Sequence, residues 1–130
     1  MQTEAVWRAL PRKIREVLAE KDLHDLQEIR LRSGQPLLLK RENRLFSLGK
    51  EGVFPAADEK GMRISMADLR ETVSLLSGYS LYAFEEELRQ GYLTIEGGHR
   101  VGFCGKAVLE NGEIRTLRQI NALNIRIARE

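Results

Sequence analysis

The sequence predicts an α+β domain, in which a mainly antiparallel sheet carries its helices on one face. Three observations support this. Apolar residues recur at helical spacing near the N-terminus and in the middle of the chain. Apolar and charged residues alternate in several short stretches, and Gly-Gly and Asn-Gly pairs separate such stretches in the last third. Tight hairpins join antiparallel strands, and helices bury their apolar faces against such a sheet.

Two helices are expected before the first strand. Apolar residues follow each other at intervals of three or four positions, at Val6, Leu10, Ile14, Val17 and Leu18. Pro11 interrupts this pattern, because proline fits the opening turn of a helix and disrupts its interior. The pattern therefore indicates a short first helix and a second helix with Pro11 in its opening turn.

Three strands are expected next. Strict alternation in 28–32 is typical of a half-buried strand with Ile29 and Leu31 facing inward. Residues 37–39 and 44–48 read as two further strands, joined by a tight turn. Residues 49–61 read as a loop, because glycine, proline and mixed charges dominate them. A boundary between two subdomains in this loop stays open.

The middle of the chain predicts two helices, and the remainder predicts strands. One helix begins at Ser65 or Met66 and ends at Gly78, and the next ends at Gly91. The strands are expected in two hairpins, 92–96 with 99–104 and 106–109 with 113–116, followed by a last strand over 123–127.

Composition excludes several classes of protein. The chain has 130 residues, 42% of them hydrophobic and 31% charged, which fits one globular domain over 1–130. Its net charge of +2 gives no general attraction to nucleic acid. No apolar run reaches the roughly 20 residues of a membrane helix, and the single Cys104 cannot form an internal disulfide. We expect a cytoplasmic domain without direct membrane insertion.

Glycine-rich motifs resemble known sites but lack their chemistry. Residues 97–106 resemble a P-loop, yet Arg100 stands where the loop needs glycine, and Ala107 replaces the magnesium-binding hydroxyl. His99 and Cys104 lack the further ligands of a zinc site, and neither has the partners of a nucleophile. We therefore expect no catalytic residue, no bound cofactor and no metal in this chain.

Arginines are the remaining candidates for function. Arg30 and Arg32 share the outward face of one predicted strand, and further arginines lie in the β-rich half, at Arg100, Arg115, Arg118 and Arg126. They read either as ordinary surface charge or as a site that recognises anions or carboxylates at an interface.

Four stretches of sequence resemble the stage III sporulation protein AA family, namely 28–36, 79–95, 97–105 and 124–130. The residues that carry this resemblance, with structural roles expected for them, are Glu28, Arg30, Arg32, Gly34, Pro36, Gly97, Gly98, His99, Gly102 and Gly105.

The resemblance implies the N-terminal domain of a longer protein. That family is a cytoplasmic ATPase of endospore-forming bacteria, similar to the hexameric ATPases of type II and type IV secretion. It acts in the mother cell and energises the stage III sporulation channel to the forespore. Its members continue into a RecA-like core with Walker motifs, which this chain lacks. ATP and magnesium are therefore expected in the full-length protein, and no enzymatic activity in this domain.

The same resemblance implies partners for the domain. They are its own ATPase core, neighbouring subunits of a homo-hexamer, and membrane-anchored channel proteins. The domain is expected to serve oligomerisation, regulation and docking. Arg100, Arg115, Arg118 and Arg126 are candidates to act in trans on the nucleotide of a neighbouring subunit. A nucleic-acid-binding module is the alternative function, although the charge balance predicts no nucleic-acid partner.

Overall fold

A computed structural model describes residues 3–19, 21, 24–58, 60–78, 81–111 and 113–128. Its helices are α1 (Glu4–Arg8), α2 (Arg12–Ala19), α3 (Met66–Ser77), α4 (Leu81–Gln90) and the short 3₁₀ helix η1 (Ala56–Asp58). Its strands are β1 (Leu26–Arg32), β2 (Leu38–Arg41), β3 (Arg44–Gly49), β4 (Gly52–Pro55), β5 (Tyr92–Ile95), β6 (His99–Glu110) and β7 (Glu113–Arg126).

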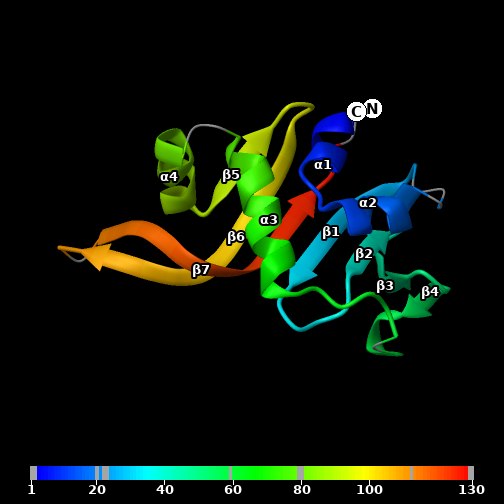
Figure 1. The fold of residues 1–130 in the computed structure, drawn as a ribbon. Helices are drawn as coiled ribbons and strands as arrows, with labels where there is room; N and C mark the ends of the chain where they lie inside the picture. Colours follow the sequence, from blue (N-terminus) through cyan, green and yellow to red (C-terminus); the bar gives the residue numbers. More distant parts are fainter. Residues whose placement is uncertain are drawn as a thin grey trace.

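All of these strands belong to one antiparallel sheet, with the order β4-β3-β2-β1-β7-β6-β5. The α-helices lie on one side of it (Figure 1). The predicted α+β class is therefore confirmed. The sheet also continues across the stretch that could have divided the chain into two subdomains.

Strand β7 lies inside the sheet, because it pairs with both β1 and β6. Ile125 lies opposite Ile29 of β1 and Val101 of β6, and Leu123 lies opposite Leu31 and Phe103 in the same way. Directly opposite residues share one face of a sheet. These buried side chains form the middle of the core, as the alternation in β1 predicts.

The helices bury their apolar sides against this face. Val6, Leu10 and Ile14 of the N-terminal segment are fully buried, and so is Leu69 of α3. The α4 residue Phe84 meets Phe103 of β6 edge to face, with ring centroids 5.5 Å apart. Aromatic pairs favour this geometry, which holds α4 on the sheet.

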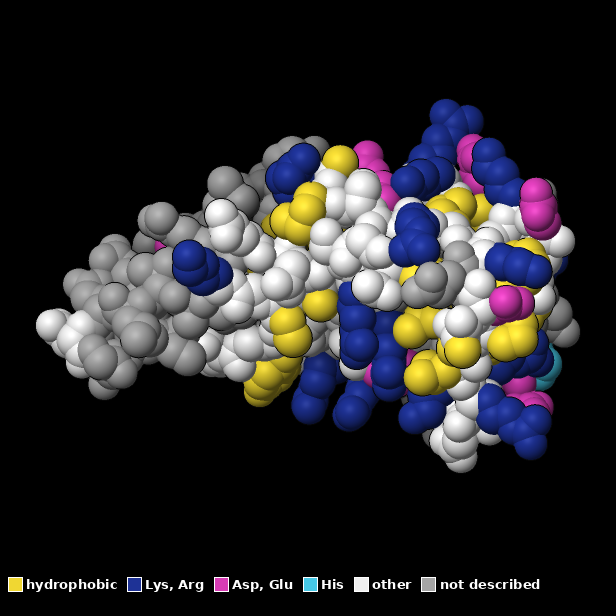
Figure 2. All heavy atoms as spheres, turned by 90° about the horizontal axis from the view of Figure 1, so that it is seen from below, with side chains coloured by type: hydrophobic (Ala, Val, Ile, Leu, Met, Phe, Trp, Pro, Cys, Tyr) yellow, Lys and Arg dark blue, Asp and Glu magenta, His cyan; other side chains and the backbone are white. Residues whose placement is uncertain are grey.

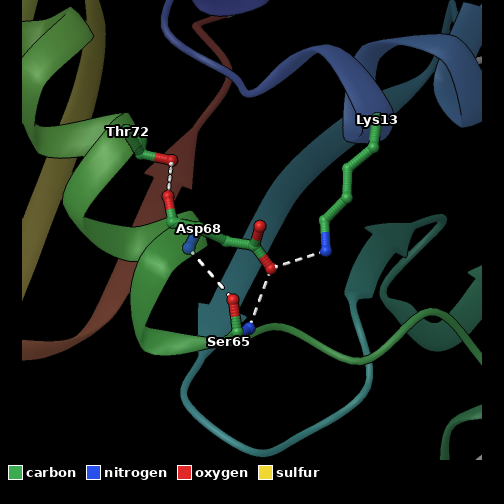
Figure 3. Close-up of polar contacts among 4 residues, drawn as sticks. All are labelled: Lys13, Ser65, Asp68 and Thr72. Atoms are coloured by element: carbon green, nitrogen blue, oxygen red, sulfur yellow. Dashed lines mark hydrogen bonds and ion pairs between the residues drawn. The ribbon is translucent and has the colours of Figure 1, made fainter.

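A polar cluster joins α2 to the start of α3 (Figure 3). Ser65 Oγ accepts a hydrogen bond from Asp68 N at 3.1 Å, and Asp68 Oδ2 accepts one from Ser65 N at 2.8 Å, which completes a capping box. Lys13 Nζ lies 2.9 Å from the same carboxylate. Burial would raise the pKa of Asp68, but these hydrogen bonds and the Lys13 charge hold it below its ordinary value.

Two expectations about the strands are wrong. Residues 49–61 are not only a loop, because β4 pairs with β3 and η1 follows it. β4 is an edge strand, where glycine and proline are tolerated. The predicted hairpin strands over 99–116 and the last strand belong to two long strands, β6 and β7, whose register shifts between Cys104 and Lys106. A shift of this kind bends a strand without ending it.

Candidate interaction face

A row of polar side chains crosses the sheet on the face opposite the core. Thr94 lies opposite Arg100, and Arg100 lies opposite Arg126. Arg126 lies opposite Glu28, which in turn lies opposite Lys40. Since directly opposite residues share a face, these five side chains form one row over five strands.

Two further rows extend this face. The second contains Tyr92, Gly102, Asn124, Arg30 and Leu38, and the third contains Cys104, Ala122 and Arg32. We call the cationic residues of the three rows, Arg30, Arg32, Lys40, Arg100 and Arg126, the basic face. Seen from below, Lys and Arg side chains project from the middle of the molecule along the lower edge of the view (Figure 2).

Glu28 lies in the middle of the basic face and is 6% exposed. Arg30 contacts both of its carboxylate oxygens at 3.4 Å. Burial would raise the pKa of Glu28, but hydrogen bonds from Asn124 and Arg30, with the charges of Arg30 and Lys40, hold the pKa below its ordinary value. Glu28 is therefore ionised at neutral pH and offsets part of the surrounding positive charge.

Two further contacts on this face involve Tyr92 and Asn124. The guanidinium carbon of Arg100 lies 4.8 Å from the centroid of the Tyr92 ring, within the range of a cation–π contact. This contact holds the Arg100 guanidinium toward β5, whereas Arg126 lies on β7, on the other side of β6. The amide oxygen of Asn124 is buried and accepts no hydrogen bond from the described residues. A buried acceptor without a donor costs about 1–3 kcal/mol.

The structure brings two of the four candidate trans-acting arginines together. Arg100 and Arg126 lie directly opposite each other on neighbouring strands, and both are exposed. Arg115 and Arg118 belong to β7, but their side chains lie outside the described residues. A role of these arginines in trans therefore stays a prediction.

The glycine motifs before β2 and before β6 form turns. Gly34 has a φ of 76° and donates its N–H to Ile64 O at 2.8 Å, while Pro36 forms an isolated bridge with Arg63. Gly97 and Gly98 join β5 to β6 with φ angles of 97° and 83°, which glycine adopts without strain. These residues form turns that lead into strands of the sheet.

His99 has a structural contact as well. Its side chain is fully buried, and its Nδ1 accepts a hydrogen bond from Ala128 N at 2.9 Å. Cys104 points to the opposite face of β6, so the two residues do not converge as ligands would. Among the residues that the structure describes, no group of three His, Cys, Asp or Glu side chains could hold a metal ion.

The two other motif glycines belong to β6. Gly102 pairs with Tyr92 and Asn124 on the face that carries the arginines, and Gly105 lies at the register shift. Sequence reasoning found Arg30, Arg32, Arg100 and Arg126, but it missed Lys40, Tyr92 and Asn124. The outward positions of Tyr92 and Asn124 follow from alternation, whereas their contacts depend on register between distant strands.

A model of the family described as "Sporulation stage III, protein AA" matches residues 1–130. The chain belongs to the stage III sporulation protein AA family. It is 37% identical over 124 residues to stage III sporulation protein AA of Bacillus subtilis (strain 168). The match covers 93% of this chain and 36% of that protein, so the chain spans about a third of the length of its curated relative.

Among solved structures, the chain is similar to the VirB11 ATPase of the Brucella suis type IV secretion system, in complex with sulphate. That match has a TM-score of 0.44 and 14% identity, and it covers 91% of this chain and 30% of the VirB11 chain. None of the helices in the described residues of this family member has the length and apolar character to cross a membrane.

Proposed function

We propose that this chain is the N-terminal accessory domain of a sporulation ATPase that works in the mother cell. It serves oligomerisation, regulation and docking to the membrane-anchored stage III channel. Membership of the family over the whole chain supports this, together with its span of about a third of a curated relative. ATP and magnesium then bind the remaining part of the protein, because this sequence lacks a P-loop lysine followed by serine or threonine.

One observation carries the regulatory part of the proposal. Arg100 and Arg126 lie directly opposite each other on the face that carries no helix. Like charges that lie directly opposite each other destabilise a sheet. An anionic partner offsets the repulsion between Arg100 and Arg126 and so stabilises this arrangement. We infer that they raise ATP turnover from across the subunit boundary of a homo-hexamer, with Arg115 and Arg118 as further candidates.

Turnover of the full-length protein tests this role. Arg100→Gln and Arg126→Gln, alone and together, should lower kcat, by about 10³-fold if an arginine acts as a trans-acting finger. Arg12→Gln is the matched control, since Arg12 is exposed on α2, where it pairs with Glu16. Light scattering measures hexamer formation in each variant. Unchanged kcat and unchanged hexamers for all four arginines, each replaced by Ala or Gln, would contradict the proposal.

Docking is tested separately with the 130-residue chain. Immobilised chain should retain a cytoplasmic segment of a membrane-anchored channel protein, and the charge-neutral double variant Arg100→Gln with Arg126→Gln should retain less of it. If the unchanged chain and the double variant retain the segment equally, or if neither retains it, docking through the basic face is removed from the proposal.

A further inference from the structure

The basic face has an excess of positive charge that nothing on it neutralises. Its three rows contain five cationic side chains and a single carboxylate, Glu28. That carboxylate is buried and already bound by Arg30. Arg32, Arg100 and Arg126 are exposed. A ligand for this face therefore brings negative charge.

The cations present the geometry of a carboxylate site. Each guanidinium is a planar fork that can donate two parallel hydrogen bonds to one carboxylate. The cation–π contact with Tyr92 holds Arg100 toward β5, and the register places Arg126 on β7, on the other side of β6. Neighbouring strands lie roughly 4.8 Å apart, so one extended ligand that crosses these strands can place successive acidic groups on the two forks.

One observation favours a polypeptide over a plain phosphodiester backbone as the ligand of this face. The Asn124 amide oxygen has no donor among the described residues, and a polypeptide carries N–H groups that can supply one once the surrounding side chains shift. Phosphodiester groups carry no hydrogen-bond donor.

We propose that the basic face binds an acidic segment of a partner polypeptide, with its carboxylates on Arg100 and Arg126. This inference rests on the proposed function, since it names the chemistry of the partner that this domain docks. An acidic segment needs only a few carboxylates spaced along an extended chain.

A binding measurement with a defined probe tests the inference. A short fluorescent peptide that alternates glutamate with serine should bind the 130-residue chain, whereas the same peptide with glutamine for glutamate should not. The double variant Arg100→Lys with Arg126→Lys keeps both charges but loses both forks. It should weaken binding about tenfold or more, because bidentate charge-assisted hydrogen bonds are lost.

The control is Arg12→Lys, which should bind the glutamate peptide as the unchanged chain does. Circular dichroism confirms that each variant is folded. Absence of peptide binding would overturn the inference. So would equal affinity of the double lysine variant, because that outcome means general attraction to anions. Tighter binding of duplex DNA or of phosphatidylglycerol vesicles than of the peptide would also overturn it.

The two proposals fail in different ways. If the double lysine variant loses ATP turnover in the full-length protein but keeps peptide affinity, the role in trans stands and the peptide site does not. If it loses peptide affinity with full turnover, the peptide site stands and the role in trans does not.

Discussion

Glu28 shows how one buried carboxylate organises a face that is otherwise cationic. Arg30 contacts both of its oxygens, and Asn124 donates to it. Glu28→Gln should therefore lower the free energy of unfolding by about 1–3 kcal/mol, because part-buried Arg30 loses its counter-charge. Urea unfolding measures the change. Glu85→Gln is the control, since Glu85 is exposed on α4 and should change stability by less than about 0.5 kcal/mol.

Glu28 and Asp68 also predict how stability depends on pH. The pKa of each is lowered in the folded chain, from ordinary values of 4.5 and 3.8. Their contribution is therefore fully present above those values, and it is lost as pH falls through the lower folded pKa values. Unfolding free energy measured from neutral pH downward should decline below about pH 4.5. The unfolding free energy of Glu28→Gln should decline less steeply with falling pH than that of the unchanged chain. An identical slope for the two would contradict the contribution assigned to Glu28.

At the scale of the element, the segment before α3 packs so closely against β3 that it requires a glycine at position 61. A Cβ on Gly61 would overlap Ser47 Oγ, and Ser47 Oγ donates to Leu37 O at 2.9 Å. Gly61→Ala should lower the free energy of unfolding by about 1–3 kcal/mol, and Ser47→Ala should lower it by about 1 kcal/mol.

Because the second change removes the overlapping oxygen, the double variant should be more stable than the sum of the two losses predicts, by at least about 0.5 kcal/mol. A double-mutant cycle in urea measures this coupling, and simple additivity would contradict the contact. Gly49→Ala is the control, because a Cβ there meets its neighbours at ordinary distances of 3.4–3.5 Å.

The elements also show how far sequence reasoning reaches. Local periodicity located β1, the N-terminal helices and both middle helices, because their patterns repeat within a few residues. It missed β4, since Gly52 and Pro55 suit a loop and become a strand only through pairing with β3. It also divided β6 and β7, because Gly105 and its neighbours resemble a turn until the register of both strands is known.

The basic face could be predicted only in part from the sequence, because part of it depends on pairing between distant strands. Alternation places Arg30 and Arg32 on one outward face, and that requires nothing beyond β1 itself. The row that joins Arg100, Arg126 and Glu28 depends on pairing between strands that are far apart in the sequence. The Arg100–Tyr92 contact depends in the same way on the register of β5 with β6.

At the scale of the whole molecule, one sheet and one core predict a single unfolding transition. The strands before and after residues 49–61 share the same sheet, and their inward residues form one hydrophobic cluster. Trp7 fluorescence reports the α1 region, and far-ultraviolet circular dichroism reports the whole backbone. Their urea transitions should coincide, as in two-state unfolding. Two separated midpoints would instead indicate independent subdomains.

The position of β7 between β1 and β6 determines how the molecule responds to mechanical force. Antiparallel ladders hold residues 122–126 of β7 on both sides, and the amide of Ala128, just beyond its end, is fixed by His99. Hydrogen bonds in these ladders lie perpendicular to the strand. Tension applied along β7 at Ala128 is therefore shared among both ladders in shear, so this strand resists extraction instead of peeling away one bond at a time.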